Sequence, residues 1–214
     1  GAWEWWRHRT GILTSNFAEA GAFLRSSPEE ALPDLQLHFV VAKLLDHGRK
    51  TVRGHGYSCH VCVLRPRSRG TVRLRSADPL TLPAVDPNFL ADADDLQRTV
   101  RGVQIVRRIL AQPALARHGA RELPASAAAQ TSEQIADWVR QYADTIYHPV
   151  GTCRMGPGPQ DVVDHQLRVH GVQGLRVVDA SIFPCITSGN TNAPCIMLGE
   201  KAAHMVLAEA QRWA

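Results

Sequence analysis

Two short segments near the C-terminal end carry the residues best suited to chemistry. The first contains Tyr147-His148-Pro149, and a histidine is the usual general base near neutral pH. Pro149 fixes its own φ and biases His148 toward extended geometry, which helps to hold the imidazole in place. Gly151 and Gly156 follow, and glycine allows a backbone to approach a ligand closely. The alternative is that His148, one of ten histidines, only caps a loop.

The second segment is a polar turn from Thr187 to Asn192, just before a helix that we expect near Pro194. Asn190 and Asn192 could cap that helix and satisfy its free N–H groups. They could instead bind an anionic or electron-accepting group at the positive end of the helix. The residue types alone favour capping.

Other catalytic patterns are absent from the sequence. No serine has the G-x-S-x-G setting of a hydrolase nucleophile. Asp161 and Asp164 are close in sequence but lie in an expected loop, without a clear acid–base pairing. There is no G-x-G-x-x-G: the runs that begin at Gly54 and Gly156 reach Cys59 and Asp161 where the third glycine belongs. The chain therefore carries no phosphate-binding dinucleotide fingerprint.

The five cysteines do not form a disulfide framework, because their number is odd and their spacing irregular. We expect a reducing compartment. Cys59-x-x-Cys62 has His55 and His60 nearby, but a zinc finger would need a second ligand pair. The segment also favours a strand, which would point Cys59 and Cys62 to opposite faces. We expect no metal site.

A net charge of +4 and a dense arginine patch raise the question of nucleic acid. The patch could bind phosphates, or it could be a solvated hairpin with alternating outward charges. No aromatic residues interleave it to stack on bases, so we favour the hairpin and expect no nucleic-acid partner. Its members are Arg65, Arg67, Arg69, Arg73 and Arg75.

The first half of the chain favours antiparallel strands. Apolar residues alternate from Leu35 to Val41, which is typical of a half-buried strand. Tyr57 to Leu64 and Thr71 to Ser76, joined by a polar link, predict a hairpin. Prolines between Asp78 and Pro87 predict a loop.

Helical spacing follows. Apolar residues from Leu96 to Leu110 predict one helix. Pro113 to Ala129 favours a loop with at most a short helix. A second helix follows Thr131, because Thr131 and Gln134 have capping-box spacing and an apolar stripe runs on to Tyr142.

The C-terminal part predicts a short strand from Leu175 to Asp179, then the polar turn, then a helix to the end of the chain. Pro194 suits the first turn of that helix. A strand, a turn and a helix N-terminus are a common setting for cofactor contacts.

Length and composition bound these expectations. The 214 residues, 44% of them hydrophobic, suffice for one or two domains with a sizeable core. No apolar run approaches the roughly 18 residues of a membrane helix. The chain lacks a starting Met and begins without the features of a secretory signal, so we expect a fragment of a longer protein.

Three long motifs in order resemble the C-terminal part of glucose–methanol–choline (GMC) flavin oxidoreductases, near the choline dehydrogenase-like and alcohol dehydrogenase-like members. Segments nearer the start, such as 13–25 and 60–79, are also similar to those members. The motifs are YHPVGTCRMG (147–156), VVDHQLRVHGVQGLRVVDASIFP (162–184) and SGNTNAPCIMLGEKAA (188–203).

The resemblance implies an α+β fold. Residues 1–160 would form the substrate-binding domain, an antiparallel sheet flanked by helices. Residues 161–214 would supply a strand and the closing helix to a Rossmann-like FAD domain. The rest of that domain, with its glycine fingerprint, would be the N-terminal half of the same protein.

The resemblance also assigns roles to residues. The histidine of the family's HPxGT motif matches His148, and its second catalytic residue matches Asn190. Five positions match flavin contacts. They are Asp179, Ala180, Asn190, Thr191 and Asn192.

The implied reaction oxidises an alcohol, choline-like or another primary alcohol, to the aldehyde by hydride transfer to flavin, with His148 as the base. The implied partners are FAD, the alcohol and the FAD-binding half of the same protein. We expect the protein to lie in the cytoplasm or at the periphery of the inner membrane. We expect FAD in the full-length protein but not in this fragment, which we expect to be inactive alone. The alternative is an isolated fragment that acts only as a non-catalytic substrate-binding or interaction module.

Overall fold

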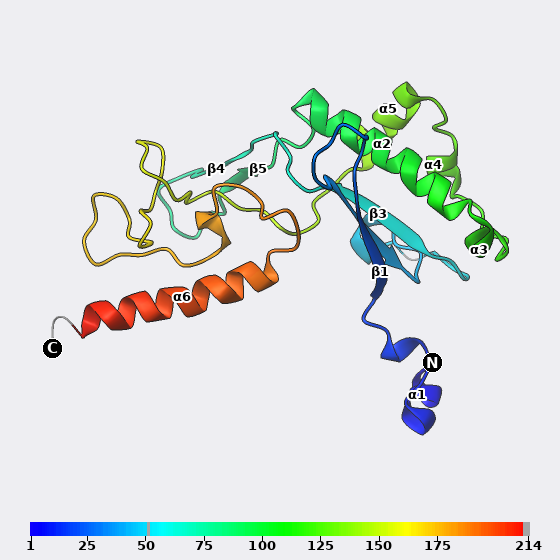
Figure 1. Ribbon diagram of the computed structural model, residues 1–214, viewed down its shortest axis with the longest axis horizontal. Coiled ribbons are helices and arrows are strands. Elements are labelled where there is room, and N and C mark those ends of the chain that lie inside the picture. Colours follow the sequence, from blue (N-terminus) through cyan, green and yellow to red (C-terminus); the bar gives the residue numbers. More distant parts are fainter. Residues whose placement is uncertain (51, 212–214) are drawn as a thin grey trace. The chain divides into compact units, whose positions relative to one another are not determined.

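The computed structural model describes residues 1–50 and 52–211, and its mixed α+β elements are labelled in Figure 1. The chain divides into two compact units, which are taken here one at a time. Unit 1 comprises Gly1–Val63 and Ala93–Tyr142, and unit 2 comprises Leu64–Asp92 and Ala143–Ala214. Antiparallel sheets with helices packed against them confirm the predicted fold class.

A three-stranded antiparallel sheet forms the base of unit 1, in the order β1 (Ala18–Leu24), β2 (Leu35–Val40) and β3 (Ser58–Val63). Leu35 and Leu37 of the central strand are buried as the alternating pattern predicted, but Gln36 and Val40 are buried too and Val41 is exposed, so the alternation does not hold along the whole strand. The strands predicted at 35–41 and 57–64 are confirmed. β1 was not predicted, because its Ala- and Gly-rich sequence has little strand propensity.

The predicted hairpin between 57–64 and 71–76 is wrong. β3 pairs with β2, matching Leu35 to Val63 and Leu37 to Val61. β4 (Thr71–Arg73) pairs instead with β5 (Ala84–Asp86), inside the segment predicted as a loop. The apolar residues of β3, paired with β2, are half-buried, whereas every residue of β4 is exposed and offers no such gain.

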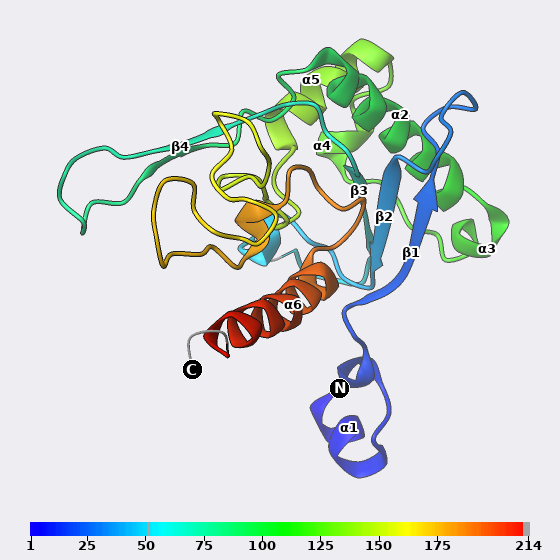
Figure 2. The same cartoon turned by 60° about the vertical axis from the view of Figure 1, so that its left-hand side comes forward.

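Helix α2 (Ala93–Leu110) packs on β3 of this sheet, and α5 (Ser132–Tyr142) packs on α2, as Figure 2 shows. Both helices were predicted. The capping box before α5 is confirmed, because the Thr131 N–H donates to Gln134 Oε1 at 3.0 Å and the Gln134 N–H donates to Thr131 Oγ1 at 3.2 Å.

Short elements complete unit 1. The segment predicted as a loop between α2 and α5 holds two single-turn helices, each opened by a proline. Among the described residues, the short helices are α1 (Ala2–His8), η1 (Ile12–Thr14), η2 (Asp46–Gly48), α3 (Pro113–Ala116) and α4 (Pro124–Ala127).

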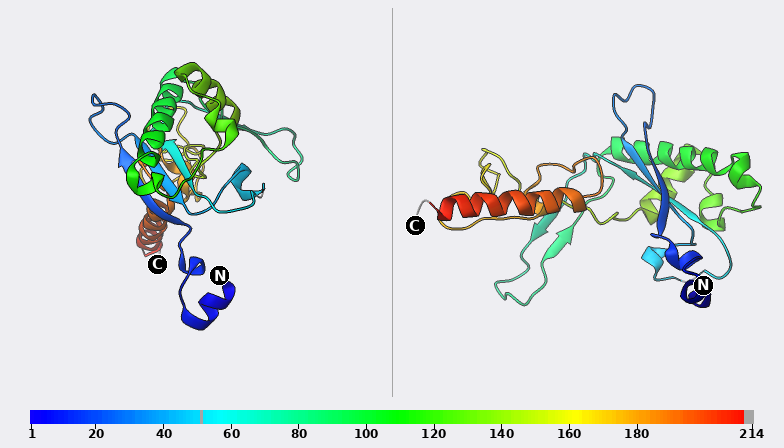
Figure 3. Two further views of the ribbon diagram at one scale, coloured as in Figure 1. Left: turned by 90° about the vertical axis from the view of Figure 1, so that its right-hand side faces the viewer. Right: turned by 60° about the horizontal axis from the view of Figure 1, so that its bottom comes forward.

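Unit 2 has little regular structure apart from the β4–β5 ribbon, drawn with its long loop in Figure 3, the turn η3 (Ala180–Ile182) and helix α6 (Asn192–Ala210). The strand predicted from Leu175 to Asp179 is wrong: only Arg176 forms an isolated bridge, with Arg168. Gly174, with φ of +71°, turns the chain just before it, and the Asp179 carboxylate starts η3 by accepting the Ser181 N–H.

The helix predicted near Pro194 is α6, which begins two residues earlier. Proline is tolerated there because the N–H groups of a first helical turn have no intrahelical partner.

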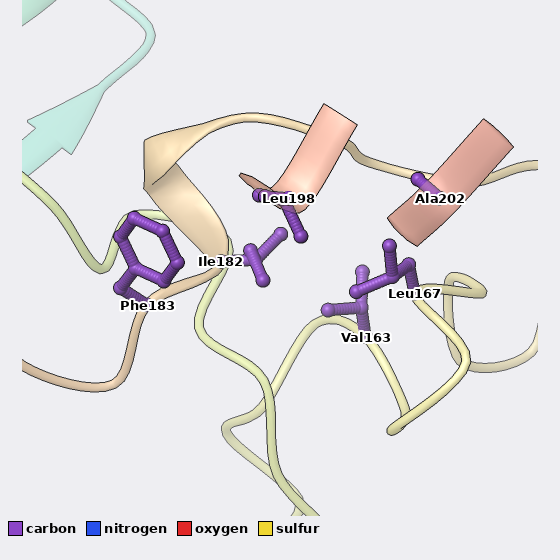
Figure 4. Packing of buried hydrophobic residues seen from close by; sticks show 6 residues of the cluster. All are labelled: Val163, Leu167, Ile182, Phe183, Leu198 and Ala202. Carbon is purple, nitrogen blue, oxygen red and sulfur yellow. The ribbon is translucent and has the colours of Figure 1, made fainter. Parts of the chain in front are cut away.

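An apolar core holds the loops of unit 2 to one side of α6. Figure 4 shows Ile182 near Leu198 of α6, with the loop residues Val163 and Leu167 and the helix residue Ala202 in the same cluster. All are buried, and Ile182 and Val163 are almost completely so. Burial of apolar area, rather than a continuous sheet, therefore orders this unit.

A buried ion-pair network secures unit 1. Asp34 is completely buried, and its carboxylate accepts the Ser26 N–H and hydroxyl at 2.7 Å each. The Arg98 guanidinium of α2 lies 3.6 Å from the same carboxylate and also pairs with Glu30 and Asp94. The network thus links the β1–β2 connection to α2.

We predict that Asp34→Ala destabilises the protein by about 3 kcal/mol, because it leaves Ser26 without its acceptor and removes one partner of a buried charge. The free energy of unfolding from denaturant titration measures this. Asp137→Ala breaks the exposed pair between Asp137 and Arg140 and should cost less than about 1 kcal/mol. Equal costs for the two variants would contradict the role of the network.

Three carboxylates of unit 2, those of Asp161, Asp164 and Glu209, have lowered pKa values. The Gly158 N–H and the Arg154 guanidinium hold the pKa of Asp161 below its ordinary value of 3.8. Arg176 and Arg168 similarly hold the pKa of Glu209 below 4.5. A carboxylate with a depressed folded pKa stabilises the fold above its unfolded pKa and loses that contribution as the pH falls through the folded value.

We predict that stability declines as the pH falls below about 4.5 and that Asp161→Asn makes this decline shallower, since the variant has no proton to take up at this position. The midpoint of denaturant unfolding, measured from pH 7 to pH 3, gives both slopes. The variant should also be less stable than wild type at pH 7. Identical slopes would show that Asp161 does not contribute.

Candidate active site

The two residues singled out for catalysis meet in unit 2. His148 Nε2 lies 2.7 Å from the amide nitrogen Nδ2 of Asn190, although 42 positions separate them in sequence. Asn190 is exposed and His148 is half-buried, so a small molecule can reach the pair. A basic ring nitrogen beside an amide donor is suited to take a proton from an oxygen and stabilise the charge left on it.

Thr191 contacts the other nitrogen of the same ring. Its Oγ1 lies 3.0 Å from His148 Nδ1, and its backbone N–H is 3.4 Å from that nitrogen. Thr191 is only 8% exposed and occupies the N-cap position of α6. The cap position therefore belongs to Thr191, not to Asn190 or Asn192 as the capping alternative supposed, and no side-chain capping bond forms there.

Backbone pairing positions the His148 segment. The N–H of Cys153 donates to Ser181 O at 3.0 Å, and that of Met155 donates to Ile182 O at 2.8 Å. Val150 and Met155 pack against the core around Ile182. The histidine is therefore anchored to the turn that leads to Asn190.

A left-handed glycine allows the close approach of this segment. Gly151 has φ of +92°, and a side chain there would begin 3.4 Å from the carbonyl oxygen of Phe183. A residue with a Cβ disfavours this φ. The glycine of the HPVGT stretch is thus required by the backbone.

Both segments also contain non-glycine residues in the left-handed region. Tyr147, directly before His148, has φ of +67°, and Ser188, two residues before Asn190, has φ of +61°. Such conformations carry a cost and persist only where surrounding contacts enforce them. Each of the two thus lies just before one member of the pair.

Arg65 supports the second segment. Its Nη1 donates to Ser188 Oγ at 3.0 Å, across 123 positions of sequence. The sequence indicated only a solvated charge, but this member of the arginine patch reaches the turn beside Asn190. Neither Arg65 nor the strain at Ser188 could be inferred from local sequence, since both depend on a distant contact.

The remaining residues matched to flavin contacts lie nearby in the chain but outside the hydrogen-bonded set of His148, Asn190 and Thr191. Asp179 is exposed and caps η3 through the Ser181 N–H at 2.7 Å. Ala180 is half-buried against the core. Asn192 is exposed as the first residue of α6.

The N-terminal end of α6 fits an electron-rich aromatic cofactor edge. The helix has 19 residues and no acidic residue in its first turn, so its positive end is not neutralised from within. Asn190, Asn192 and Ala193 leave this end exposed. Amide donors and a helix N-terminus can stabilise an aromatic ring that gains negative charge on reduction. The structure thus fits the ring side of a flavin.

The described helices include none with the length and apolar character needed to cross a membrane.

Comparison with known proteins gives a family. A family model described as GMC oxidoreductase matches residues 66–199, more than half of the chain and a range that contains His148 and Asn190. An alcohol dehydrogenase (acceptor) from Pseudomonas putida is 49% identical over 199 residues, which are 93% of this chain and 36% of that protein. An oxygen-dependent choline dehydrogenase from Escherichia coli O139:H28 is 45% identical over 203 residues, which are 95% of this chain and 36% of that protein.

Solved structures agree. Pyridoxine 4-oxidase from Mesorbium loti aligns with a TM-score of 0.78 and 30% identity, over 88% of this chain and 37% of that chain. A formate oxidase aligns with a TM-score of 0.83 and 25% identity, over 100% of this chain and 42% of that chain.

The chain spans 36% of the length of the two dehydrogenases. GMC family members bind FAD, in keeping with the edge presented at α6. The family match and the two sets of relatives lead to one conclusion: this chain belongs to the GMC oxidoreductases, as the C-terminal domain of that family.

Proposed function

We propose that this chain is the C-terminal portion of an FAD-dependent oxidoreductase that oxidises an alcohol CH–OH group to the aldehyde. The observation that carries the proposal is the 2.7 Å contact between His148 Nε2 and Asn190 Nδ2 at the exposed N-terminal end of α6. The relatedness to an alcohol dehydrogenase and a choline dehydrogenase supports it.

In this proposal His148 is the base. Its Nε2 accepts the proton as the O–H bond of the alcohol breaks, and general-base help of this kind is worth about 100- to 10,000-fold in rate. Asn190 Nδ2 donates a hydrogen bond to the same oxygen and stabilises its developing negative charge. The core around Ile182 and the Arg65–Ser188 bond keep both groups in place.

FAD, when bound, supplies the acceptor for the hydride that leaves the alcohol carbon. Two sets of residues in this chain would hold it. The first is the polar turn and helix start, Asn190, Thr191 and Asn192; the second is the neighbouring η3 turn, Asp179 and Ala180.

We propose a primary alcohol, choline-like or other, as the substrate class; one of the two dehydrogenases is named for an alcohol and the other for choline. A quaternary ammonium group would need aromatic or carboxylate contacts beyond the pair described here. Screening alcohols with oxygen and with an artificial acceptor, in the full-length flavoprotein, identifies the substrate and the acceptor together.

For the whole protein, we propose that residues 1–160 form the substrate-binding domain and residues 161–214 the return segment of the FAD-binding domain. Contacts within this chain group 143–160 with the return segment, since Met155 bridges to Val163. The domain boundary at residue 160 is therefore proposed for the whole protein. We propose that its FAD-binding half is the partner of this chain. We propose that the whole protein lies in the cytoplasm or at the periphery of the inner membrane.

The outer face of α6 supports such a partner. Ile196 is 61% and Leu207 59% exposed, and they lie on one side of the helix, opposite the buried Leu198 and Ala202. An apolar helix face of this kind normally packs against another element. We propose that the FAD-binding half covers it.

A second candidate function is a substrate-binding or interaction module without FAD. It is favoured by one observation, the absence of a dinucleotide fingerprint in this sequence. Flavin absorbance of the purified 214-residue chain and alcohol binding by calorimetry distinguish the two: binding without flavin supports the module.

We predict that His148→Ala in the full-length flavoprotein slows flavin reduction by the alcohol about 100-fold or more, because the proton acceptor is lost. Stopped-flow absorbance measures this rate, and FAD content should stay at the wild-type level. His118→Ala, at an exposed position after α3, is the control and should reduce at the wild-type rate. A rate of flavin reduction within a few-fold of wild type for His148→Ala would contradict the role of His148 as the base.

We predict that Asn190→Ala also slows reduction, by about 100-fold, because the developing charge on oxygen loses a donor. The same stopped-flow assay applies, with the rate taken per bound FAD and circular dichroism as the check on folding, because Asn190 is also among the residues proposed to hold FAD. Asn190→Asp removes the donor while keeping the shape and should be at least as slow. Unchanged reduction kinetics in both variants would refute the role of the amide.

We predict that Leu207→Ala destabilises the full-length protein by about 2 kcal/mol, since the FAD-binding half would bury this side chain. Denaturant unfolding gives the value. Leu198→Ala, which opens a cavity in the core of unit 2, is the positive control. A cost below about 0.5 kcal/mol for Leu207→Ala alone would mean that this face stays in water.

A further inference from the structure

Thr191 stands where a helix cap is expected but does not act as one. At an N-cap, the oxygen of a threonine side chain normally accepts an N–H from the first helical turn. Here no such bond forms, and Thr191 Oγ1 instead lies 3.0 Å from His148 Nδ1. The residue is buried and β-branched, so its hydroxyl is held in one direction. This hydroxyl serves the histidine rather than the helix.

The contact at Nε2 of His148 determines which ring nitrogen carries the proton. An amide nitrogen can only donate, so Asn190 Nδ2 at 2.7 Å requires an unprotonated Nε2. A neutral imidazole carries one proton, which must then be on Nδ1. Thr191 Oγ1 accepts that proton's hydrogen bond.

The backbone of Thr191 would favour the opposite arrangement. Its N–H donates a long hydrogen bond to Nδ1 at 3.4 Å, and this contact is weaker than the 3.0 Å contact that the hydroxyl makes with the same nitrogen. If the hydroxyl were removed, this N–H would be the neighbour left to Nδ1 and would favour an unprotonated Nδ1. The proton would then move to Nε2 and occupy the position from which His148 accepts the substrate proton.

We infer that Thr191 is a positioning residue whose hydroxyl holds His148 in the Nδ1–H tautomer, with the lone pair of Nε2 directed toward Asn190 and the substrate position. The inference rests on the proposed role of His148 as base. The carboxylate of a catalytic triad acts on its histidine in a related way, with a charged group in place of this neutral one. Thr191 thus acts through His148 and needs no contact with the alcohol.

The test uses the full-length, FAD-bound protein without substrate, labelled with ¹⁵N in its histidines. Long-range ¹H–¹⁵N correlation spectra report which ring nitrogen carries the proton, and comparison with His148→Ala identifies the His148 signals. The wild type should show the Nδ1–H form. Thr191→Val keeps the shape and the backbone N–H but removes the hydroxyl, so it should shift His148 toward the Nε2–H form.

The same variants are assayed for flavin reduction by the alcohol. Thr191→Val should be slower by roughly tenfold or more, the effect of losing one hydrogen bond of ordinary strength. Thr191→Ser keeps a hydroxyl and should restore both the tautomer and most of the rate. Thr71→Val removes an exposed hydroxyl from β4 and is the matched control, with tautomer and rate as in wild type.

Three results would overturn the inference. They are an Nε2–H tautomer in the wild type, an unchanged tautomer in Thr191→Val, and a Thr191→Ser variant as impaired as Thr191→Val. If Thr191→Val does not fold with FAD, the wild-type spectrum and Thr191→Ser still decide. A different result would contradict the proposed function: flavin reduction by the alcohol at the wild-type rate in His148→Ala.

Discussion

Everything at the site depends on one short stretch of backbone pairing. The N–H groups of Cys153 and Met155 donate to the carbonyls of Ser181 and Ile182, directly over the buried core. This pairing joins the segment after His148 to the segment before Asn190, so the distance between their side chains is set by main-chain bonds rather than by flexible side chains. Burial of Ile182 keeps water from competing for those bonds, and α6 closes the core from the other side.

The strain at the site follows from that anchoring. Tyr147 and Ser188 have left-handed backbones without being glycine, a conformation that is uncommon for residues with a Cβ. The core on one side and the Arg65–Ser188 bond on the other supply the contacts that enforce it. A site placed on irregular segments thereby gains the fixed geometry that helices or strands usually provide. Removal of a supporting contact would act on His148 and Asn190 through the backbone.

The sequence predicted best what depends on neighbouring residues. The alternation in 35–41, the periodicity of 96–110 and the Thr131–Gln134 box all describe local preferences, and all three elements are present. Strand pairing was harder to predict. Whether β3 pairs with β2 or with β4 depends on the apolar area that each pairing buries, and this area cannot be read from local sequence. Likewise, histidine and asparagine could be recognised as chemical residues by type, and their family roles by resemblance. The contact between Thr191 and His148 could not be predicted in this way, because the two residues are 43 positions apart and meet only in the folded chain.

The 2.7 Å contact between Asn190 and His148 also bears on what the site accepts and releases. Since the amide already satisfies the lone pair of Nε2, an incoming hydroxyl exchanges one hydrogen bond for another, and entry favours molecules that can donate as well as accept. In the proposed reaction Nε2 ends with a proton, and a protonated ring nitrogen cannot accept a hydrogen bond from the Asn190 amide. The resting contact would therefore re-form only after that proton has left the ring.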